Sequence, residues 1–196
     1  DRMSQISVNN LTFAYDGSYD NVFEDVSLCL DTDWRLGFVG RNGKGKTTFL
    51  NLLMEKYEYK GTITANVDFI YFPFEIADRS EYPLDIASRI CPGSAQWELE
   101  RETGLLELDP GVLFRPYETL SFGEQTKLML AMLFLKDNGF LLIDEPTNHL
   151  DSHARTVVSK YLNSKKGFIL VSHDRIFLDN CTDHILSINR ADITVT

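Results

Sequence analysis

The feature that most limits how this chain can fold is a glycine-rich octapeptide at residues 40–47. It is Gly-Arg-Asn-Gly-Lys-Gly-Lys-Thr, and it matches G-x-x-x-x-G-K-[ST] at every fixed position. A short apolar run, 36–39, precedes it, and a stretch with helical character, 46–56, follows it. A phosphate-binding loop needs this strand–turn–helix setting, because glycines let backbone N–H groups turn inward and a helix N-terminus attracts anions. The octapeptide, called the phosphate loop below, therefore predicts an α/β fold that binds nucleotide phosphates.

The side chains of the phosphate loop have separate expected tasks. Lys46 is placed to reach the β- and γ-phosphates of ATP, and the Thr47 hydroxyl is placed to ligate Mg²⁺. Lys44 is expected to be a solvated loop residue without a role. The alternative, a glycine-rich turn with a chance lysine, is disfavoured by the flanking strand and helix. The residues expected to bind nucleotide here are Gly40, Asn42, Gly43, Gly45, Lys46, Thr47 and Thr48.

Apolar periodicity predicts the other elements of the core. Alternating apolar residues at 6–13 and 26–30, with Asp-Gly and Asp-Asn turn signals between them, indicate an antiparallel β layer. Further along, short apolar runs alternate with helical stretches, which is typical of a mainly parallel sheet. The remaining expected strands are 67–72, 140–143, 168–171 and 185–188, and a further helix is expected at 152–162.

The middle of the chain has a different character, mostly helical and interrupted by prolines. These are Pro83, Pro92, Pro110 and Pro116. We expect a helical lobe at about 78–136, inserted into a core made of about 1–77 and 137–196. The predicted fold class is α/β, a mainly parallel P-loop NTPase core with an antiparallel β layer and an inserted helical lobe.

Composition excludes several other classes of protein. The chain has 196 residues, 43% of them hydrophobic, which suits one domain. Acidic residues outnumber basic ones, 29 to 19, and this disfavours a domain that grips RNA or DNA through its own phosphate contacts. The three cysteines are far apart and suit a reducing, cytoplasmic compartment. No apolar run approaches the roughly 20 residues of a membrane-spanning helix, so no membrane insertion is expected.

An acidic pair follows the apolar run 140–143. Ligands of α/β sheets bind at the carboxyl ends of the strands, so Asp144 is expected to hold Mg²⁺ through its water shell. Glu145 comes next and is placed to polarise or deprotonate the attacking water. An isolated Asp-Glu pair is more often a surface turn, but the preceding strand and the phosphate loop favour the catalytic interpretation.

A further motif makes the resemblance specific. Residues 120–125, Leu-Ser-Phe-Gly-Glu-Gln, are close to the LSGGQ signature of ATP-binding cassette ATPases, and we call them the signature segment. The phosphate loop, the signature segment, the acidic pair and a late Ser-His-Asp at 172–174 follow the order and approximate spacing of that family. The chain resembles this family over essentially its whole length. Ser121 and Glu124 also have the spacing of a capping box, which predicts a helix beginning at Ser121.

The resemblance implies a site shared between two domains. In the family, the signature segment caps the γ-phosphate bound by a partner domain, so that two domains enclose two ATP molecules head to tail. Ser121, Gly123 and Gln125 would then contact the nucleotide of the partner. A capped helix without a ligand is the alternative. A chain of this kind is expected to be a monomer with poor activity by itself.

Three more roles follow from the resemblance. Tyr15 matches the aromatic residue that stacks on adenine, although it could be a packed strand residue. His173 matches the switch histidine that contacts the γ-phosphate, the alternative being a surface histidine. Asp151 matches a loop aspartate that communicates across the dimer, or it only caps the next helix. His149 and His153 are four residues apart without an evident third ligand, so zinc is not expected.

One position departs from the family pattern. Where the family usually has Tyr-x-Pro-Gln, residues 71–75 are Tyr-Phe-Pro-Phe-Glu. Phe74 occupies the place of the glutamine and cannot ligate Mg²⁺. Either Glu75 substitutes for it, or the contact is absent.

The string Glu-Pro-Thr-Asn-His-Leu-Asp at 145–151 resembles the ABC-F branch, whose members are cytosolic, carry two tandem cassettes and bind the ribosome. Phe74-Glu75 and the stretch 123–127 look like the antibiotic-protection members. Met3 lies just before the first expected strand and the chain ends inside another, so we expect the first cassette of a longer protein, with ribosome contacts mostly elsewhere. Two alternatives are the ATPase subunit of a membrane transporter and a non-hydrolysing nucleotide-gated module, which the intact Glu145 disfavours.

Overall fold

A computed structural model describes residues 4–40, 43–189 and 191–196, and its strands form two sheets. The larger sheet has the order β5-β6-β7-β3-β8-β9, and the smaller one has the order β2-β1-β4. The strands are β1 (Gln5–Phe13), β2 (Phe23–Asp31), β3 (Arg35–Gly40), β4 (Lys60–Thr64), β5 (Asp68–Phe72), β6 (Gly139–Asp144), β7 (Phe168–Val171), β8 (His184–Asn189) and β9 (Asp192–Val195).

The larger sheet is parallel from β5 to β8, and only β9 runs antiparallel to its neighbour. Its central strands are apolar runs because both faces are covered; all four residues of β7 are buried. Alternate residues of β6 face opposite sides of the sheet. Phe140 and Leu142 belong to one apolar cluster, and Leu141 and Ile143 belong to the other.

The smaller sheet and helix α1 (Gly43–Leu53) cover one face of the larger sheet. Strand β1 pairs antiparallel with both β2 and β4, and its apolar residues pack in the same cluster as Phe38 of β3 and Phe49 of α1. The predicted antiparallel layer is thus confirmed. Strand β4 was not predicted, because its sequence, Lys-Gly-Thr-Ile-Thr, lacks an alternation of apolar residues and is largely exposed.

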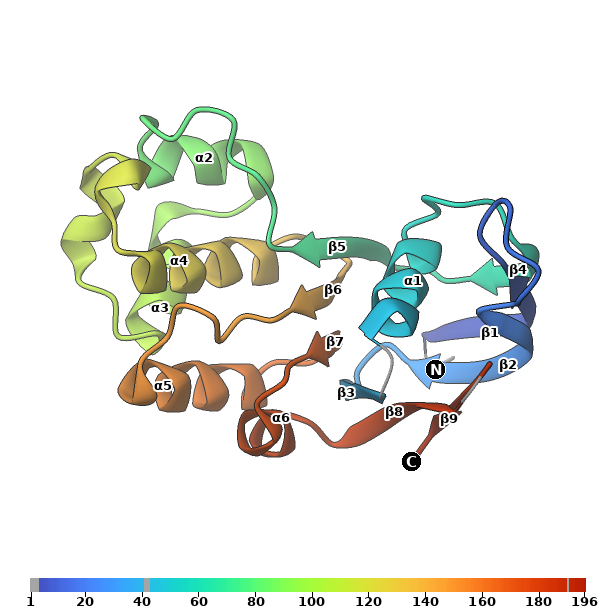
Figure 1. Ribbon diagram of the computed structural model, residues 1–196. Helices are drawn as coiled ribbons and strands as arrows, with labels where there is room; N and C mark the ends of the chain where they lie inside the picture. The colour runs from blue at the N-terminus through green and yellow to red at the C-terminus, as the bar shows by residue number, and fades with distance from the viewer. Residues whose placement is uncertain (1–3, 41–42, 190) are drawn as a thin grey trace.

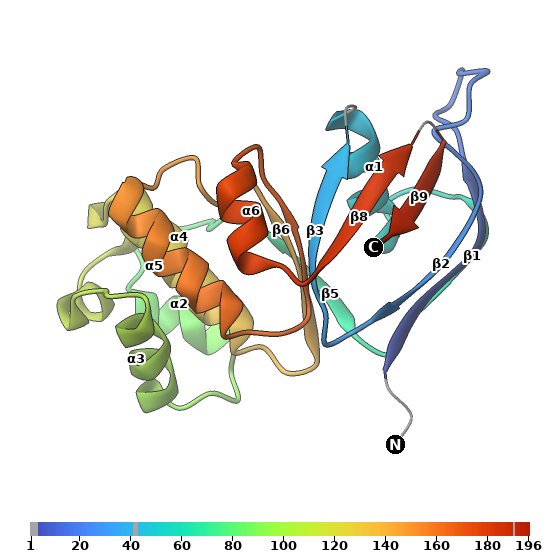
Figure 2. The ribbon, with the colours of Figure 1, turned by 90° about the horizontal axis from the view of Figure 1, so that it is seen from below.

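Helical elements fill the segment between β5 and β6 and cover the opposite face of the larger sheet. They gather at one end of the molecule, and the smaller sheet lies at the other (Figures 1 and 2). The elements are α2 (Pro83–Ile90), α3 (Gln96–Leu105), the 3₁₀ turns Pro110–Phe114 and Tyr117–Thr119, and α4 (Phe122–Phe134). The predicted fold class is confirmed, while the proposed boundaries of a separate lobe stay a prediction.

Capping side chains determine where the later helices begin. Ser121 is the N-cap of α4 and forms a complete capping box with Glu124, as the sequence predicted. Asp151 caps α5 (Ser152–Asn163), since its carboxylate accepts from the backbone N–H of Ala154 at 2.8 Å. Asp174 caps the short helix α6 (Arg175–Cys181), which the sequence analysis did not predict.

Candidate functional site

The expected catalytic residues follow three neighbouring parallel strands of the larger sheet. Strand β3 leads into the phosphate loop, β6 ends at Asp144, and β7 is followed by Ser172 and His173. These strands are adjacent in the order β6-β7-β3, and Asp144 pairs with Val171. Because all three run in the same direction, the loops that follow them share one edge of the sheet, where α/β proteins bind ligands.

Helix α1 begins inside the phosphate loop and packs tightly on β8. A Cβ added at Gly45 would lie 3.0 Å from the Ile188 Cδ1 atom, so a larger residue there would require the Ile188 side chain to shift. Lys46 is only 7% exposed, and Thr47 is exposed on the first turns of α1. Asn42 lies outside the described residues. The loop lies between strand β3 and helix α1, as predicted, and its phosphate-binding roles stay predictions.

The Tyr15 side chain is joined to α1. Its hydroxyl forms a hydrogen bond with the Thr48 hydroxyl, and the residue is 38% exposed. The ring packs edge-on against Phe13 and Tyr57, with centroid distances of 5.0 and 5.6 Å. A small aromatic cluster of Phe13, Tyr15 and Tyr57 therefore lies beside helix α1. Tyr57 was not singled out in the sequence, because nothing local distinguishes it from a surface tyrosine.

The Asp144 carboxylate is held by a tyrosine of the neighbouring strand. The Tyr71 hydroxyl donates to Asp144 Oδ2 at 2.6 Å. Burial, followed by this hydrogen bond and the negative charge of Asp144, raises the pKa of the Tyr71 hydroxyl well above its usual value. The Thr47 hydroxyl and the Asp144 carboxylate are the oxygen donors that Mg²⁺ prefers, so the expected metal residues fit this ion.

Glu145 and His173 are paired with each other. The His173 Nε2 atom lies 3.1 Å from Glu145 Oε1, and the His173 backbone N–H donates to Glu145 Oε2 at 3.3 Å. The Glu145 backbone is in the left-handed region, with φ at 52°, and its N–H donates to the Val171 carbonyl at 2.8 Å. Left-handed backbone is strained at a non-glycine residue, and Glu145 shares it with five other non-glycine residues of the described chain. The structure thus brings the expected base and the expected switch histidine together.

The signature segment begins α4 and faces the loop after β6. Phe122 is 63% exposed, and its ring centroid lies 5.0 Å from that of His149. A Cβ added at Gly123 would lie 3.3 Å from the His149 carbonyl oxygen, which is a tight contact. Ser121 Oγ already accepts from the Glu124 backbone N–H at 3.1 Å. The expected roles of Ser121 and Gly123 toward a partner's nucleotide stay predictions.

Gln125 is engaged inside the protein. It is buried, its Oε1 atom accepts from Arg79 Nη2 at 2.8 Å, and its Nε2 atom donates to the Tyr117 and Leu120 carbonyls at 3.2 and 3.1 Å. Each polar atom of its amide thus has a protein partner. In this structure Gln125 fixes the start of α4, and its expected contact with a partner's nucleotide stays a prediction.

The place of the family glutamine is apolar in this structure. Phe74 is half-buried, and its backbone N–H lies 3.4 Å from Met129 Sδ. It lines a cavity of about 270 Å³ beside Asp144 and Glu145, at the start of α4. Glu75 is exposed and does not line this cavity. The side chain from this end of β5 that does contact Asp144 is Tyr71, which the sequence analysis missed as a functional candidate.

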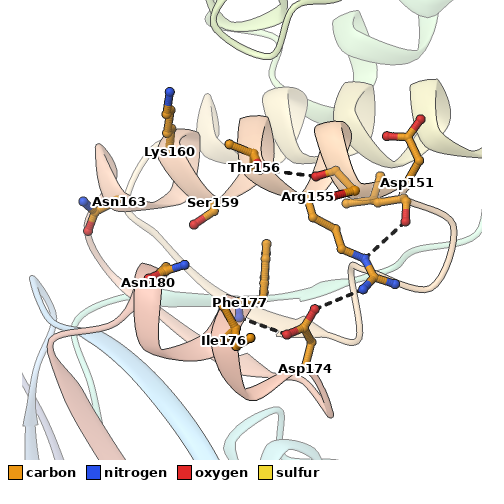
Figure 3. Close-up of a pocket in the computed structure, with 12 residues that line it drawn as sticks. Asp151, Arg155, Thr156, Ser159, Lys160, Asn163, Asp174, Ile176, Phe177 and Asn180 are labelled. Carbon is orange, nitrogen blue, oxygen red and sulfur yellow. Dashed lines mark hydrogen bonds and ion pairs between the residues drawn. The ribbon is translucent and has the colours of Figure 1, made fainter.

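A groove between α5 and α6 is lined at one end by Asp151 and Asp174, which lie in two loops that border the site (Figure 3). Arg155 bridges them: its Nε atom donates to the Leu150 carbonyl at 3.2 Å, and its Nη1 atom lies 3.1 Å from Asp174 Oδ2. One of these loops carries Asp151, and the other carries His173. The N-cap role of Asp151 is observed, and its expected role across a dimer stays a prediction.

Comparison with known proteins identifies the family. The ABC transporter family model matches residues 23–88 and 92–148, and the chain belongs to this family of ATP-binding cassette ATPases. Its relatives include the ATP-binding protein YdiF of Bacillus subtilis, which is 32% identical over 194 residues, covering 96% of this chain and 30% of YdiF. ATP-binding cassette sub-family F member 3 of Mus musculus is 31% identical over 180 residues, covering 88% of this chain and 25% of that protein. These relatives place the chain within the F sub-family. It spans less than a third of the length of either.

Solved structures support the fold. An ATP-binding subunit of an ABC transporter superposes with a TM-score of 0.77 at 21% identity, covering 97% of this chain and 89% of that one. A bacterial Atm1-family ABC exporter with ATP bound superposes with a TM-score of 0.76 at 18% identity, covering 98% of this chain and 38% of the exporter. Within the described residues, no helix is long and apolar enough to cross a membrane.

Proposed function

We propose that this ABC ATPase domain binds MgATP at the edge where β3, β6 and β7 end. The observation that carries the proposal is the convergence there of the phosphate loop, Asp144, and the Glu145–His173 pair. Lys46 and the backbone of the phosphate loop bind the phosphates, and Thr47 and Asp144 hold Mg²⁺. The metal neutralises the charge that develops on the transferred phosphoryl group.

Glu145 is the group we assign to the attacking water. Its Oε2 atom accepts from the His173 backbone N–H and its Oε1 atom lies 3.1 Å from His173 Nε2, so both oxygens contact a residue of the neighbouring loop. A carboxylate can accept a proton from water or orient that water for attack. His173 is highly exposed in this pair, which leaves its ring accessible to a phosphate oxygen.

We also propose that a second cassette completes the site. The start of α4 presents Ser121 and Gly123 on an element separate from the phosphate loop, and a helix N-terminus favours an anion. In the head-to-tail arrangement known for the family, this segment meets the nucleotide of the partner domain. In a longer protein with two cassettes, a linker would raise their effective concentration.

For the whole protein we propose a cytoplasmic role on the ribosome, with antibiotic protection as its most specific form. The support is membership of the F sub-family, together with the resemblance of residues 145–151 and of Phe74-Glu75. The formal charge of −10 makes this domain a poor RNA ligand, so the ribosome contacts would lie mostly in other parts of the protein.

A dilution series of the isolated chain with MgATP tests the shared site. Sedimentation is expected to show a monomer, and the phosphate released per mole of protein is expected to fall on dilution, because association costs translational and rotational freedom. Lys46→Ala should abolish MgATP binding in calorimetry. Full specific activity from a dilute monomer would contradict the shared site, and unchanged affinity in Lys46→Ala would contradict the phosphate site.

A further inference from the structure

We propose that Tyr71 is a positioning residue for Mg²⁺, which acts by fixing the carboxylate of Asp144. The inference rests on the proposed function, because it assigns Asp144 to the metal. Tyr71 lies on β5, at the edge of the larger sheet, and pairs in parallel register with Leu142, two residues before Asp144. From there its hydroxyl reaches Asp144 Oδ2 at 2.6 Å, a short hydrogen bond to a carboxylate.

The hydrogen bond divides the two oxygens of Asp144 between two tasks. Oδ2 accepts from the phenol, and Oδ1 is the oxygen that we assign to the metal ion or its water shell. Outer-shell donors of this kind orient ligating carboxylates, and their loss typically lowers metal affinity or activity 10- to 100-fold. Without the phenol, the carboxylate could rotate about its terminal torsion, which is a soft one.

Among the residues in and just after β5, Tyr71 is the one whose side chain bonds to the Asp144 carboxylate. Phe74 follows shortly after the strand but has no polar side-chain atom, and Glu75 is exposed and does not line the cavity beside Asp144. The Tyr71 ring is held in place as well. It is half-buried, and the Lys56 ammonium lies 5.7 Å from its centroid.

The test substitutes Tyr71→Phe, which removes the hydroxyl and keeps the ring. Binding of a fluorescent ATP analogue is measured at increasing Mg²⁺ and in EDTA. We expect the Mg²⁺ concentration needed for half-maximal enhancement of binding to rise about 10-fold, with unchanged affinity in EDTA. In an Asp144→Asn background, Tyr71→Phe should have no further effect on the Mg²⁺ dependence.

Tyr161→Phe is a matched control. Tyr161 also donates its hydroxyl to a carboxylate, Glu102 Oε2 at 2.7 Å, but Glu102 is not one of the residues assigned to nucleotide or metal. This variant should leave the Mg²⁺ dependence unchanged. An unchanged Mg²⁺ dependence in Tyr71→Phe, or equal losses of affinity with Mg²⁺ and in EDTA, would overturn the inference. If the wild-type protein bound no ATP analogue, the proposed function itself would be at fault.

Discussion

Two glutamates in this molecule are bonded in contrasting ways. The Glu102 side chain, on α3, is 4% exposed; it accepts from the Tyr161 hydroxyl at 2.7 Å, and its two oxygens lie 2.9 and 2.7 Å from Lys165 Nζ. The Glu145 side chain is 20% exposed, and the hydrogen-bond and ion-pair partner of its carboxylate in the described structure is His173, whose side chain is 84% exposed. Glu102 is therefore a buried carboxylate fixed by a buried tyrosine and a half-buried lysine, whereas Glu145 is held by a residue at the surface.

The backbone sharpens this contrast. Glu102 lies inside a regular helix, while Glu145 takes the left-handed conformation directly after a strand. A left-handed L-residue costs roughly 1–2 kcal/mol, so this cost is borne at the position we assign to catalysis. The comparison indicates that Glu102 contributes to stability by joining α3 to residues in and after α5, whereas Glu145, in the catalytic role that we propose for it, occupies a strained backbone position.

The largest effect is expected when the Glu145 carboxylate becomes an amide. Glu145→Gln keeps the shape but removes the base, so hydrolysis should fall about 1,000-fold, roughly 4 kcal/mol in the barrier. MgATP binding should persist. Single-turnover phosphate release, measured beside equilibrium binding, separates the two. Glu102→Gln is the control and should retain hydrolysis in whatever fraction stays folded; turnover of Glu145→Gln at the wild-type rate would remove Glu145 from the catalytic role.

The second effect is on stability. Lys165→Met removes the nearer cation of the buried Glu102 carboxylate and leaves Arg101, whose Nη2 atom lies 3.6 Å from Glu102 Oε1. Removing one partner of a buried pair typically costs about 3–5 kcal/mol. We expect the free energy of unfolding, measured by urea denaturation, to fall by about 3 kcal/mol. This is the lower end of that range, because the Lys165 side chain is 20% exposed. Lys160→Met, at an exposed position of α5, should change the free energy of unfolding by less than about 0.5 kcal/mol. Equal losses in the two variants would mean that Glu102 does not depend on Lys165.

Most of the fold and part of the candidate site could be predicted from patterns among residues that are close together in the sequence. The capping box of Ser121 and Glu124 and the strand before Asp144 depend on residues close together in the chain, so their patterns were readable. The partners of Asp144 and Glu102 were not, because Tyr71 and Lys165 lie 73 and 63 residues away from them. For the same reason Gln125 could be placed in a motif, but its bond to Arg79, 46 residues away, could not be foreseen.

The smallest effect tests the strained backbone of Glu145 by comparing two variants that both remove its carboxylate. Glu145→Ala keeps the penalty of φ at 52°, whereas Glu145→Gly relieves it. The relief, roughly 1–2 kcal/mol, is partly offset by the greater entropy of glycine in the unfolded chain, about 0.5–1 kcal/mol. Glu145→Gly should therefore be more stable than Glu145→Ala by roughly 0.5–1 kcal/mol in urea denaturation.

At Glu102, the same two substitutions are expected to differ in stability in the opposite direction. Inside a helix, glycine is less stable than alanine by about 1 kcal/mol, so Glu102→Gly should be the weaker variant there. Because each comparison is between alanine and glycine at one site, the loss of the carboxylate and its hydrogen bonds cancels to a first approximation. Alanine more stable than glycine at both positions would show that the left-handed conformation of Glu145 stores no strain, and the contrast between the two glutamates would then rest on burial alone.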